Sequence, residues 1–221
     1  MANLIYGLDA GRVAENAARA REEIATAAML AGRDPADVAL LAAVKYVPLE
    51  ELGVLAEAGL TLLGENRAQD LEAKANAYPG AFTWHFIGQL QSRKVKQIVP
   101  HVTLIHSVAS DSALTQLDRH GTPDTEVLVE VNVAGEEAKA GISPGELGAF
   151  IARCPVRVTG LMTMPPFAPD PEASRPCFAR LRELAAEHGL TQLSMGTSQD
   201  FAVAVEEGAT IVRLGSTLFA A

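Results

Sequence analysis

The chain has 221 residues, of which 48% are apolar and 20% are charged. These proportions are those of an ordinary globular protein, and they exclude disordered, collagen-like and low-complexity chains. Lys and Arg total 18 whereas Asp and Glu total 27, which gives a net charge of −9. Such an acidic chain is a poor general binder of nucleic acid or of anionic membranes, but a local pocket can still hold a small anion.

The sequence carries no sign of a targeting segment or of a metal centre. Its N-terminus has no basic segment followed by an apolar stretch, and no apolar run reaches the ~20 residues that span a membrane. The two cysteines, Cys154 and Cys177, form neither a CxxC motif nor a Cys/His cluster with zinc spacing. We therefore expect a soluble protein of the cytoplasm without a bound metal.

Helical and strand-like segments alternate along the whole chain. An Ala-rich amphipathic segment at about residues 10–31 predicts a first helix that ends near Gly32. Short apolar runs predict strands at 38–44, 61–63, 83–87, 103–106, 126–133, 156–162, 192–194 and 210–214. The segments between these strands predict helices at 48–58, 66–77, 91–99, 110–119, 143–152, 171–188 and 198–206.

Nearly continuous apolar strands that alternate with helices predict a parallel sheet covered on both faces. Eight such units favour a closed (β/α)8 TIM barrel, an α/β fold, with an extra N-terminal helix. The alternative is an open doubly wound sheet, but no G-x-G-x-x-G motif opens a helix after any strand. We expect a single domain over residues 1–221, with the barrel over about 38–221.

Lys45 is the most informative residue at the strand ends, where a parallel barrel carries its chemistry. It follows the seven apolar residues 38–44. At the mouth of a barrel, desolvation would lower the pKa of its amine, and a neutral amine forms a Schiff base with an aldehyde. The alternative is that Lys45 leaves the strand and reaches solvent.

Small residues follow the last two predicted strands, in the segments 194–198 and 215–217. The backbone N–H groups of such turns bind anions, and TIM barrels often bind phosphate after strands seven and eight. The hydroxyls of Ser198 and of Ser216 or Thr217 can add hydrogen bonds. The alternative for Ser198 is ordinary capping of the helix that follows it.

Three further polar features have two interpretations each. Arg213 lies inside an apolar strand, so its guanidinium needs an acceptor, either a carboxylate or an aromatic nitrogen of a ligand. His85 and His106 are candidate ligands or bases, although neutral histidines with local hydrogen bonds are commoner in strands. The basic segment 93–96 is a candidate contact for phosphate or nucleic acid, or a solvated helix face.

Several segments together resemble one family, the pyridoxal-phosphate homeostasis proteins (the YggS/PROSC-like group), whose relatives share the barrel domain of alanine racemase, the fold of type III enzymes of pyridoxal 5′-phosphate (PLP). The resemblance runs in order from about residue 38 to the C-terminus, and the ordered set is much more specific than any one segment. Gln89 and Arg93 depart from the family pattern, which expects histidine and asparagine there. The segments are Leu-Leu-Ala-Ala-Val-Lys45, Gly64-Glu-Asn66-Arg-Ala-Gln69, Trp84–Lys96, Ile105-His-Ser107-Val, Val131–Gly141, Gly160-Leu-Met-Thr-Met164, Leu193–Phe201 and Gly208–Gly215.

The resemblance implies that PLP is the cofactor and that Lys45 binds it covalently as an aldimine. It implies that Arg213 faces the pyridine nitrogen, and an arginine there keeps that nitrogen unprotonated because two adjacent cations repel. It also implies that Ser198, Gly215 and Ser216 bind the phosphate with nearby backbone amides. The remaining residues expected near the cofactor are Asn66, Met162 and Ser194.

Two functions fit a PLP-binding barrel. The first is a protein of PLP homeostasis that buffers the cofactor or delivers it to PLP-dependent apo-enzymes, without strong catalysis and without catalytic residues of its own. The alternative is an amino-acid racemase or another weak PLP enzyme. We favour homeostasis, because a two-base racemase needs a second base opposite the lysine. The resembling racemases take that base from an additional domain, and strand alternation turns Tyr46 away from Lys45. We expect a monomer with no nucleic-acid or membrane partner.

Overall fold

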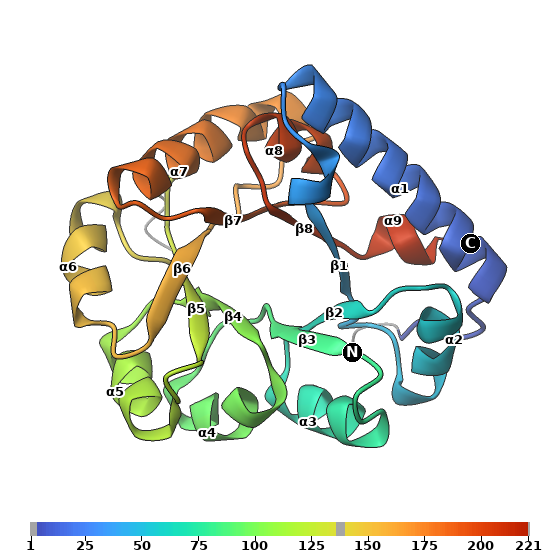
Figure 1. The fold of residues 1–221 in the computed structure, drawn as a ribbon, viewed down its shortest axis with the longest axis horizontal. Coiled ribbons are helices and arrows are strands. Elements are labelled where there is room, and N and C mark those ends of the chain that lie inside the picture. Colours follow the sequence, from blue (N-terminus) through green and yellow to red (C-terminus); the bar gives the residue numbers. More distant parts are fainter. Residues whose placement is uncertain (1–3, 136–139, 221) are drawn as a thin grey trace.

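Eight parallel strands close into a barrel in the computed structural model, which describes residues 4–135 and 140–220. Each strand pairs with the next along the chain, and β8 pairs with β1 to close the ring, with Leu41 opposite Arg213 (Figure 1). The predicted TIM barrel is therefore confirmed. The strands are β1 Ala39–Ala43, β2 Leu62–Glu65, β3 Thr83–Phe86, β4 Leu104–Val108, β5 Glu126–Glu130, β6 Arg157–Met162, β7 Gln192–Thr197 and β8 Ile211–Leu214.

Helices surround the barrel on its outside (Figure 1). The first of them, α1, packs against α8 and α9, the helices on either side of β8. Between α5 and β6, residues 136–139 lie outside the described chain. The helices are α1 Ala10–Leu30, α2 Leu52–Glu57, α3 Ala68–Ala77, α4 Val95–Ile98, α5 Asp111–His120, α6 Leu147–Arg153, α7 Arg175–Glu187, α8 Phe201–Glu206 and α9 Ser216–Phe219.

The first helix has a clear local cause. Asp9 caps its N-terminus by accepting a hydrogen bond from the backbone N–H of Arg12. Its buried positions recur every three or four residues, from Val13 to Ala28, so one apolar stripe faces the barrel. Gly32, with a φ of 68°, takes the left-handed conformation that ends the helix.

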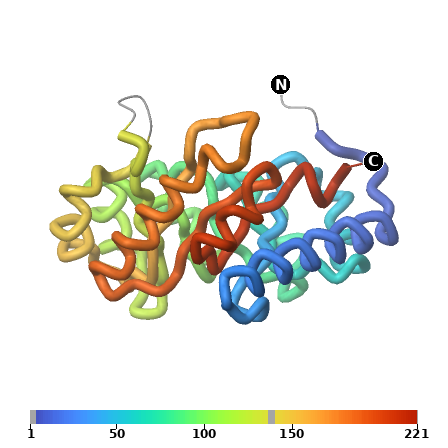
Figure 2. The backbone as a smooth tube through the Cα atoms, turned by 90° about the horizontal axis from the view of Figure 1, so that it is seen from above, coloured from blue at the N-terminus to red at the C-terminus, as the bar shows by residue number. Residues whose placement is uncertain are grey.

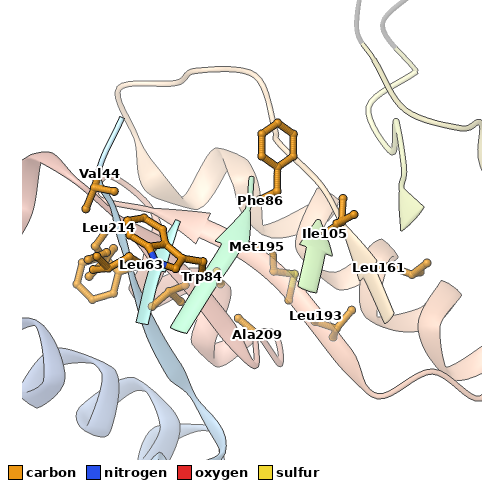
Figure 3. Close-up of a cluster of buried hydrophobic side chains, with 14 of the residues drawn as sticks. Val44, Leu63, Trp84, Phe86, Ile105, Leu161, Leu193, Met195, Ala209 and Leu214 are labelled. Carbon is orange, nitrogen blue, oxygen red and sulfur yellow. The ribbon is translucent and has the colours of Figure 1, made fainter. Parts of the chain in front are cut away.

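Apolar side chains pack in two layers. The larger layer fills the space between the strands and the helices, and it includes Leu63, Trp84, Ile105 and Leu161 (Figure 3). The smaller layer lies inside the barrel and consists of Leu41, Leu104, Leu128, Met162 and Ile211. Alternate residues of each strand thus face the outer and the inner layer, which is why apolar residues occur at consecutive positions of the strands.

Several elements differ from the sequence-based expectation, and three of the differences lie near the C-terminal ends of the strands. β5 ends at Glu130 instead of residue 133, and Val131 then forms an isolated bridge with Ile142 while its N–H still donates to the Met162 carbonyl oxygen of β6. β7 continues to Thr197, and its register with β8 shifts between Ser194 and Thr197. Helix α9 was not predicted, because its four residues are too few to show a period.

Candidate functional site

A pocket of about 570 Å³ opens at the C-terminal ends of the strands. The segments before α1 and after β6 rise on one side of the barrel (Figure 2), and Ile5 and Met164 from these segments line the pocket. Six of the eight expected site residues also line it. These are Lys45, Asn66, Ser198, Arg213, Gly215 and Ser216.

Lys45 lies in the turn that follows β1, where it is exposed. The expectation that burial desolvates its amine is therefore wrong. Its Nζ lies 5.0 Å from the ring centroid of Tyr46, which also lines the pocket. The strand-alternation argument for Tyr46 fails because β1 already ends at Ala43.

A buried ion pair lies directly behind this turn. The Nζ atom of Lys74 donates to Glu65 Oε2 at 2.5 Å and to the carbonyl oxygen of Val44 at 2.9 Å. The other carboxylate oxygen of Glu65 accepts from the backbone N–H of Asn66 at 2.7 Å. The pair thereby joins the segment before Lys45 to the segment that contains Asn66. The sequence did not indicate this ion pair, because a lysine at position 74 of a predicted helix is expected to be solvated.

Close backbone packing also fixes Asn66. Gly88, which follows β3, lies so near that a Cβ atom there would be 2.1 Å from the Asn66 carbonyl oxygen. A side chain at position 88 would therefore displace the backbone of Asn66. The glycine lets the loops after β2 and β3 approach each other at the pocket wall.

Arg213 projects from β8 and is buried. Its Nη1 donates to the Ser194 carbonyl oxygen at 2.8 Å, and its Nη2 donates to the Thr163 carbonyl oxygen at 3.1 Å. Burial lowers the pKa of the guanidinium to about 10, while the charges of Asp200 and Glu130 raise it. Arg213 therefore stays cationic at neutral pH. Within residues 4–135 and 140–220, its oxygen acceptors are these two backbone carbonyls and the Ser194 hydroxyl, and not a directly bonded carboxylate.

The remaining two expected residues lie one layer deeper than the pocket. Ser194 is fully buried, and its hydroxyl accepts a hydrogen bond from Arg213. Met162 belongs to the apolar layer inside the barrel, between the strands that carry Leu128 and Ser194. Neither residue lines the pocket, although Ser194 is joined to its wall through Arg213.

The turns after β7 and β8 are joined by one hydroxyl. Ser198 Oγ accepts from the backbone N–H groups of Gly215 and Thr217, each at 3.2 Å. Ser198 is not a helix cap, because α8 begins only at Phe201 and its N-cap residue is Asp200. Asp200 accepts from the backbone N–H of Thr197 at 2.8 Å and thereby holds the first turn. The two N–H groups that point at Ser198 are suitable donors to an anion.

The other polar candidates lie away from this pocket. His85 and His106 are buried inside the barrel and bond to each other, Nδ1 to Nε2, at 2.9 Å. In the basic segment 93–96, Lys94 donates to Gln97 Oε1 at 3.3 Å, as on an ordinary helix surface. Within residues 4–135 and 140–220 no three His, Cys, Asp or Glu side chains gather to hold a metal, and no helix is long and apolar enough to cross a membrane.

The comparisons define the class of protein first. Residues 5–221 match the profile of the family described as "Alanine racemase, N-terminal domain". Alanine racemase from Corynebacterium glutamicum has the same fold, with a TM-score of 0.69 at 17% identity over 98% of this chain and 63% of the racemase chain. The chain is thus a barrel of the alanine racemase N-terminal type.

Closer relatives narrow this class. A pyridoxal phosphate homeostasis protein from Aquifex aeolicus is 42% identical over 219 residues, 93% of this chain and 96% of the relative. One from Pseudomonas aeruginosa is 40% identical over 95% of both chains. PipY from Synechococcus elongatus, solved with PLP bound, has a TM-score of 0.77 at 32% identity over 94% of this chain and 99% of PipY. The chain therefore belongs to the family of pyridoxal phosphate homeostasis proteins.

Proposed function

We propose that this protein binds PLP in the pocket at the C-terminal ends of the strands and serves PLP homeostasis. One observation carries the proposal: Lys45, Arg213 and the turns joined by Ser198 surround a single pocket of about 570 Å³. An amine, a buried cation and a set of N–H donors match the aldehyde, the ring nitrogen and the phosphate of one molecule. The names of the relatives and the PLP bound to PipY support the same ligand.

Each group in the pocket has a defined task in this proposal. The Lys45 amine adds to the aldehyde carbon and one water leaves, so that a C=N bond holds the cofactor. Arg213 faces the pyridine nitrogen and disfavours its protonation. Ser198, Gly215 and Ser216 bind the phosphate, for which Ser198 exchanges its present N–H partners.

The other expected residues complete the binding unit. Asn66 forms the pocket wall, while Ser194 and Met162 act from below, Ser194 through Arg213. We propose that residues 1–221 form one PLP-binding domain, with its helix at about 10–31 and its barrel at about 38–221. We further propose a cytoplasmic monomer that releases PLP to PLP-dependent apo-enzymes.

A weak racemase or other PLP enzyme is the competing function. The presence of Tyr46 in the pocket favours it, since a phenol can act as a base. However, a racemase that uses two bases needs them on opposite faces of the substrate, and Tyr46 lies beside Lys45 rather than across from it. The geometry therefore supports storage and delivery better than catalysis.

Two assays on one preparation separate these functions. The protein loaded with PLP is mixed with an apo-enzyme that requires PLP, and recovery of that enzyme's activity is followed over time. The same preparation is tested for racemisation of a panel of amino acids, with Tyr46→Phe as the control. We expect transfer of PLP and negligible racemisation. Racemisation at an ordinary enzymatic rate that Tyr46→Phe abolishes would instead establish the enzyme.

A further inference from the structure

A chain of hydrogen-bonded side chains crosses the inside of the barrel. His85 Nδ1 lies 2.9 Å from His106 Nε2, and His106 Nδ1 lies 2.8 Å from Ser194 Oγ. Arg213 Nη1 in turn donates to Ser194 Oγ at 2.5 Å. The four residues come from β3, β4, β7 and β8, and none of them is more than 8% exposed.

Packing alone does not explain this chain. The inside of a TIM barrel is ordinarily filled with branched apolar side chains, as it is here at Leu41, Leu128 and Ile211. Polar groups in such surroundings are costly unless each of them is hydrogen-bonded. This series of hydrogen-bonded side chains ends at Arg213, which lies in the wall of the proposed PLP pocket. We therefore look for its function at that pocket.

The donors and acceptors fix the direction of the chain. A guanidinium only donates, so Ser194 Oγ accepts from Arg213. The hydroxyl hydrogen of Ser194 is then free to go to His106 Nδ1. His106 consequently carries its proton on Nε2 and donates to His85 Nδ1. In the opposite direction, Ser194 would accept twice and its own hydrogen would need another acceptor in the barrel interior.

The charges agree with this arrangement. Burial lowers the pKa of His85 to about 4 and lowers that of His106 well below its usual value. The positive charge of Arg213 and the neighbouring ring of His85 lower the pKa of His106 further. Both imidazoles are therefore neutral at pH 7, and Arg213 is the one cation among these four side chains.

We propose that Ser194 and His106 are positioning residues for PLP, which orient the guanidinium of Arg213, and that His85 fixes the tautomer of His106. The carbonyl and hydroxyl oxygens of Ser194 both accept hydrogen bonds from Nη1 of Arg213. They thereby hold the guanidinium in the orientation in which it faces the ring nitrogen of the ligand. This inference rests on the proposed function for its ligand. The direction of the hydrogen bonds does not depend on the proposed function, and it is tested without PLP.

The first test is the nitrogen NMR spectrum of the protein without PLP, labelled with 15N in histidine. The chain has five histidines, and the variants His85→Asn and His106→Asn identify the two signals of interest. At pH 7 we expect both rings to be protonated on Nε2 and not on Nδ1. Protonation of His106 on Nδ1 would overturn the proposed direction.

The second test measures PLP binding in three variants of the protein. Ser194→Ala and His106→Phe interrupt the series of hydrogen bonds, whereas His106→Asn keeps an acceptor at the place of Nδ1. We expect the first two to weaken PLP binding by about 2- to 10-fold, the range of one lost hydrogen bond, and His106→Asn to restore most of it. Equal affinity in all three variants and the wild type would contradict the proposal.

A purely structural role is separated by a second readout. The 15N shift of ring-labelled PLP reports the pH at which its ring nitrogen takes up a proton. We expect this pH to rise in Ser194→Ala, because a less well oriented Arg213 repels the proton less. The control Leu128→Ala lies in the same barrel interior and should lower the melting temperature without moving this pH. If the wild type failed to bind PLP, the proposed function would fall, while the NMR result would stand independently.

Discussion

The two ends of the barrel carry cavities of unequal size and different chemistry. The cavity at the N-terminal ends of the strands has about 850 Å³, and the one at the C-terminal ends has about 570 Å³. The larger cavity is lined by Asp124 and Glu126, whose carboxylates repel a phosphate, whereas the smaller one is lined by Lys45 and Arg213. The kinds of polar group in the wall, and not the volume, thus identify the end that suits PLP.

The same contrast holds for the ion pairs at the two ends. Glu65 and Lys74, behind the smaller pocket, have side chains that are 0% and 6% exposed. Glu126 and Arg157, beside the larger cavity, have side chains that are 24% and 64% exposed. Removal of one partner from a buried ion pair lowers the free energy of unfolding strongly, whereas a solvated ion pair contributes little to it. The site that we propose thus lies at the end where the ion pair is buried.

The largest expected effect is that of Lys74→Met. The substitution leaves the Glu65 carboxylate buried without its cation and removes the donor to the Val44 carbonyl oxygen. We expect the free energy of unfolding to fall by about 3–5 kcal/mol in urea titrations. The matched control Arg157→Ala should cost about 0–1 kcal/mol. Equal losses in the two variants would remove the distinction between the two ends.

Acid should destabilise the protein through the buried histidines of the barrel, of which His85 also lines the larger cavity. In the unfolded chain His85 takes up a proton near pH 6.5, whereas burial lowers its pKa in the folded protein to about 4. The unfolded chain therefore binds more protons between these values, and stability is lost as the pH falls from 6.5 toward 4. His85 alone should account for about 2 kcal/mol between pH 8 and pH 5.

Urea titrations at both pH values check this expectation. In His85→Asn the loss between pH 8 and pH 5 should be smaller by that amount, because asparagine does not titrate. An unchanged loss in this variant would show that other groups cause the acid sensitivity.

The smallest expected effect concerns the phosphate. Ser198→Ala removes one hydroxyl between the turns after β7 and β8, and it should weaken PLP binding by about 2- to 10-fold. Thr122→Ala, in the wall of the larger cavity, should leave PLP affinity unchanged. A titration of each variant with PLP decides the question. A loss in Thr122→Ala as large as that in Ser198→Ala would place the ligand at the wrong end.

Sequence alone could predict the barrel and the residues at its mouth, because strand length, apolar runs and the strand-end rule are local signals. Lys45, Arg213 and Ser198 follow from these signals. These local signals do not predict how deeply a residue is buried. The sequence therefore could not show that Ser194 and Met162 lie below the pocket instead of in its wall. The sequence also could not reveal the ion pair of Glu65 and Lys74, since burial of Lys74 depends on how α3 packs against β2.

The failure at Lys45 and Tyr46 has a similar cause. Alternation of side chains applies only while the chain remains a strand, and β1 ends two residues before Lys45. A turn conformation then brings both side chains to one pocket. A boundary error of one residue, small on the scale of the fold, therefore reverses the conclusion about the position of a site residue.

The most direct test of the central claim is reduction with borohydride followed by peptide mass spectrometry. Borohydride converts a C=N bond between PLP and a lysine into a stable amine, which marks the lysine with a phosphopyridoxyl group. The protein is incubated with PLP, reduced and digested, with Lys45→Ala treated in parallel. We predict one dominant adduct, on the peptide that contains Lys45, and its loss in the variant. No adduct, or labelling confined to surface lysines such as Lys94 and Lys96, would contradict the account.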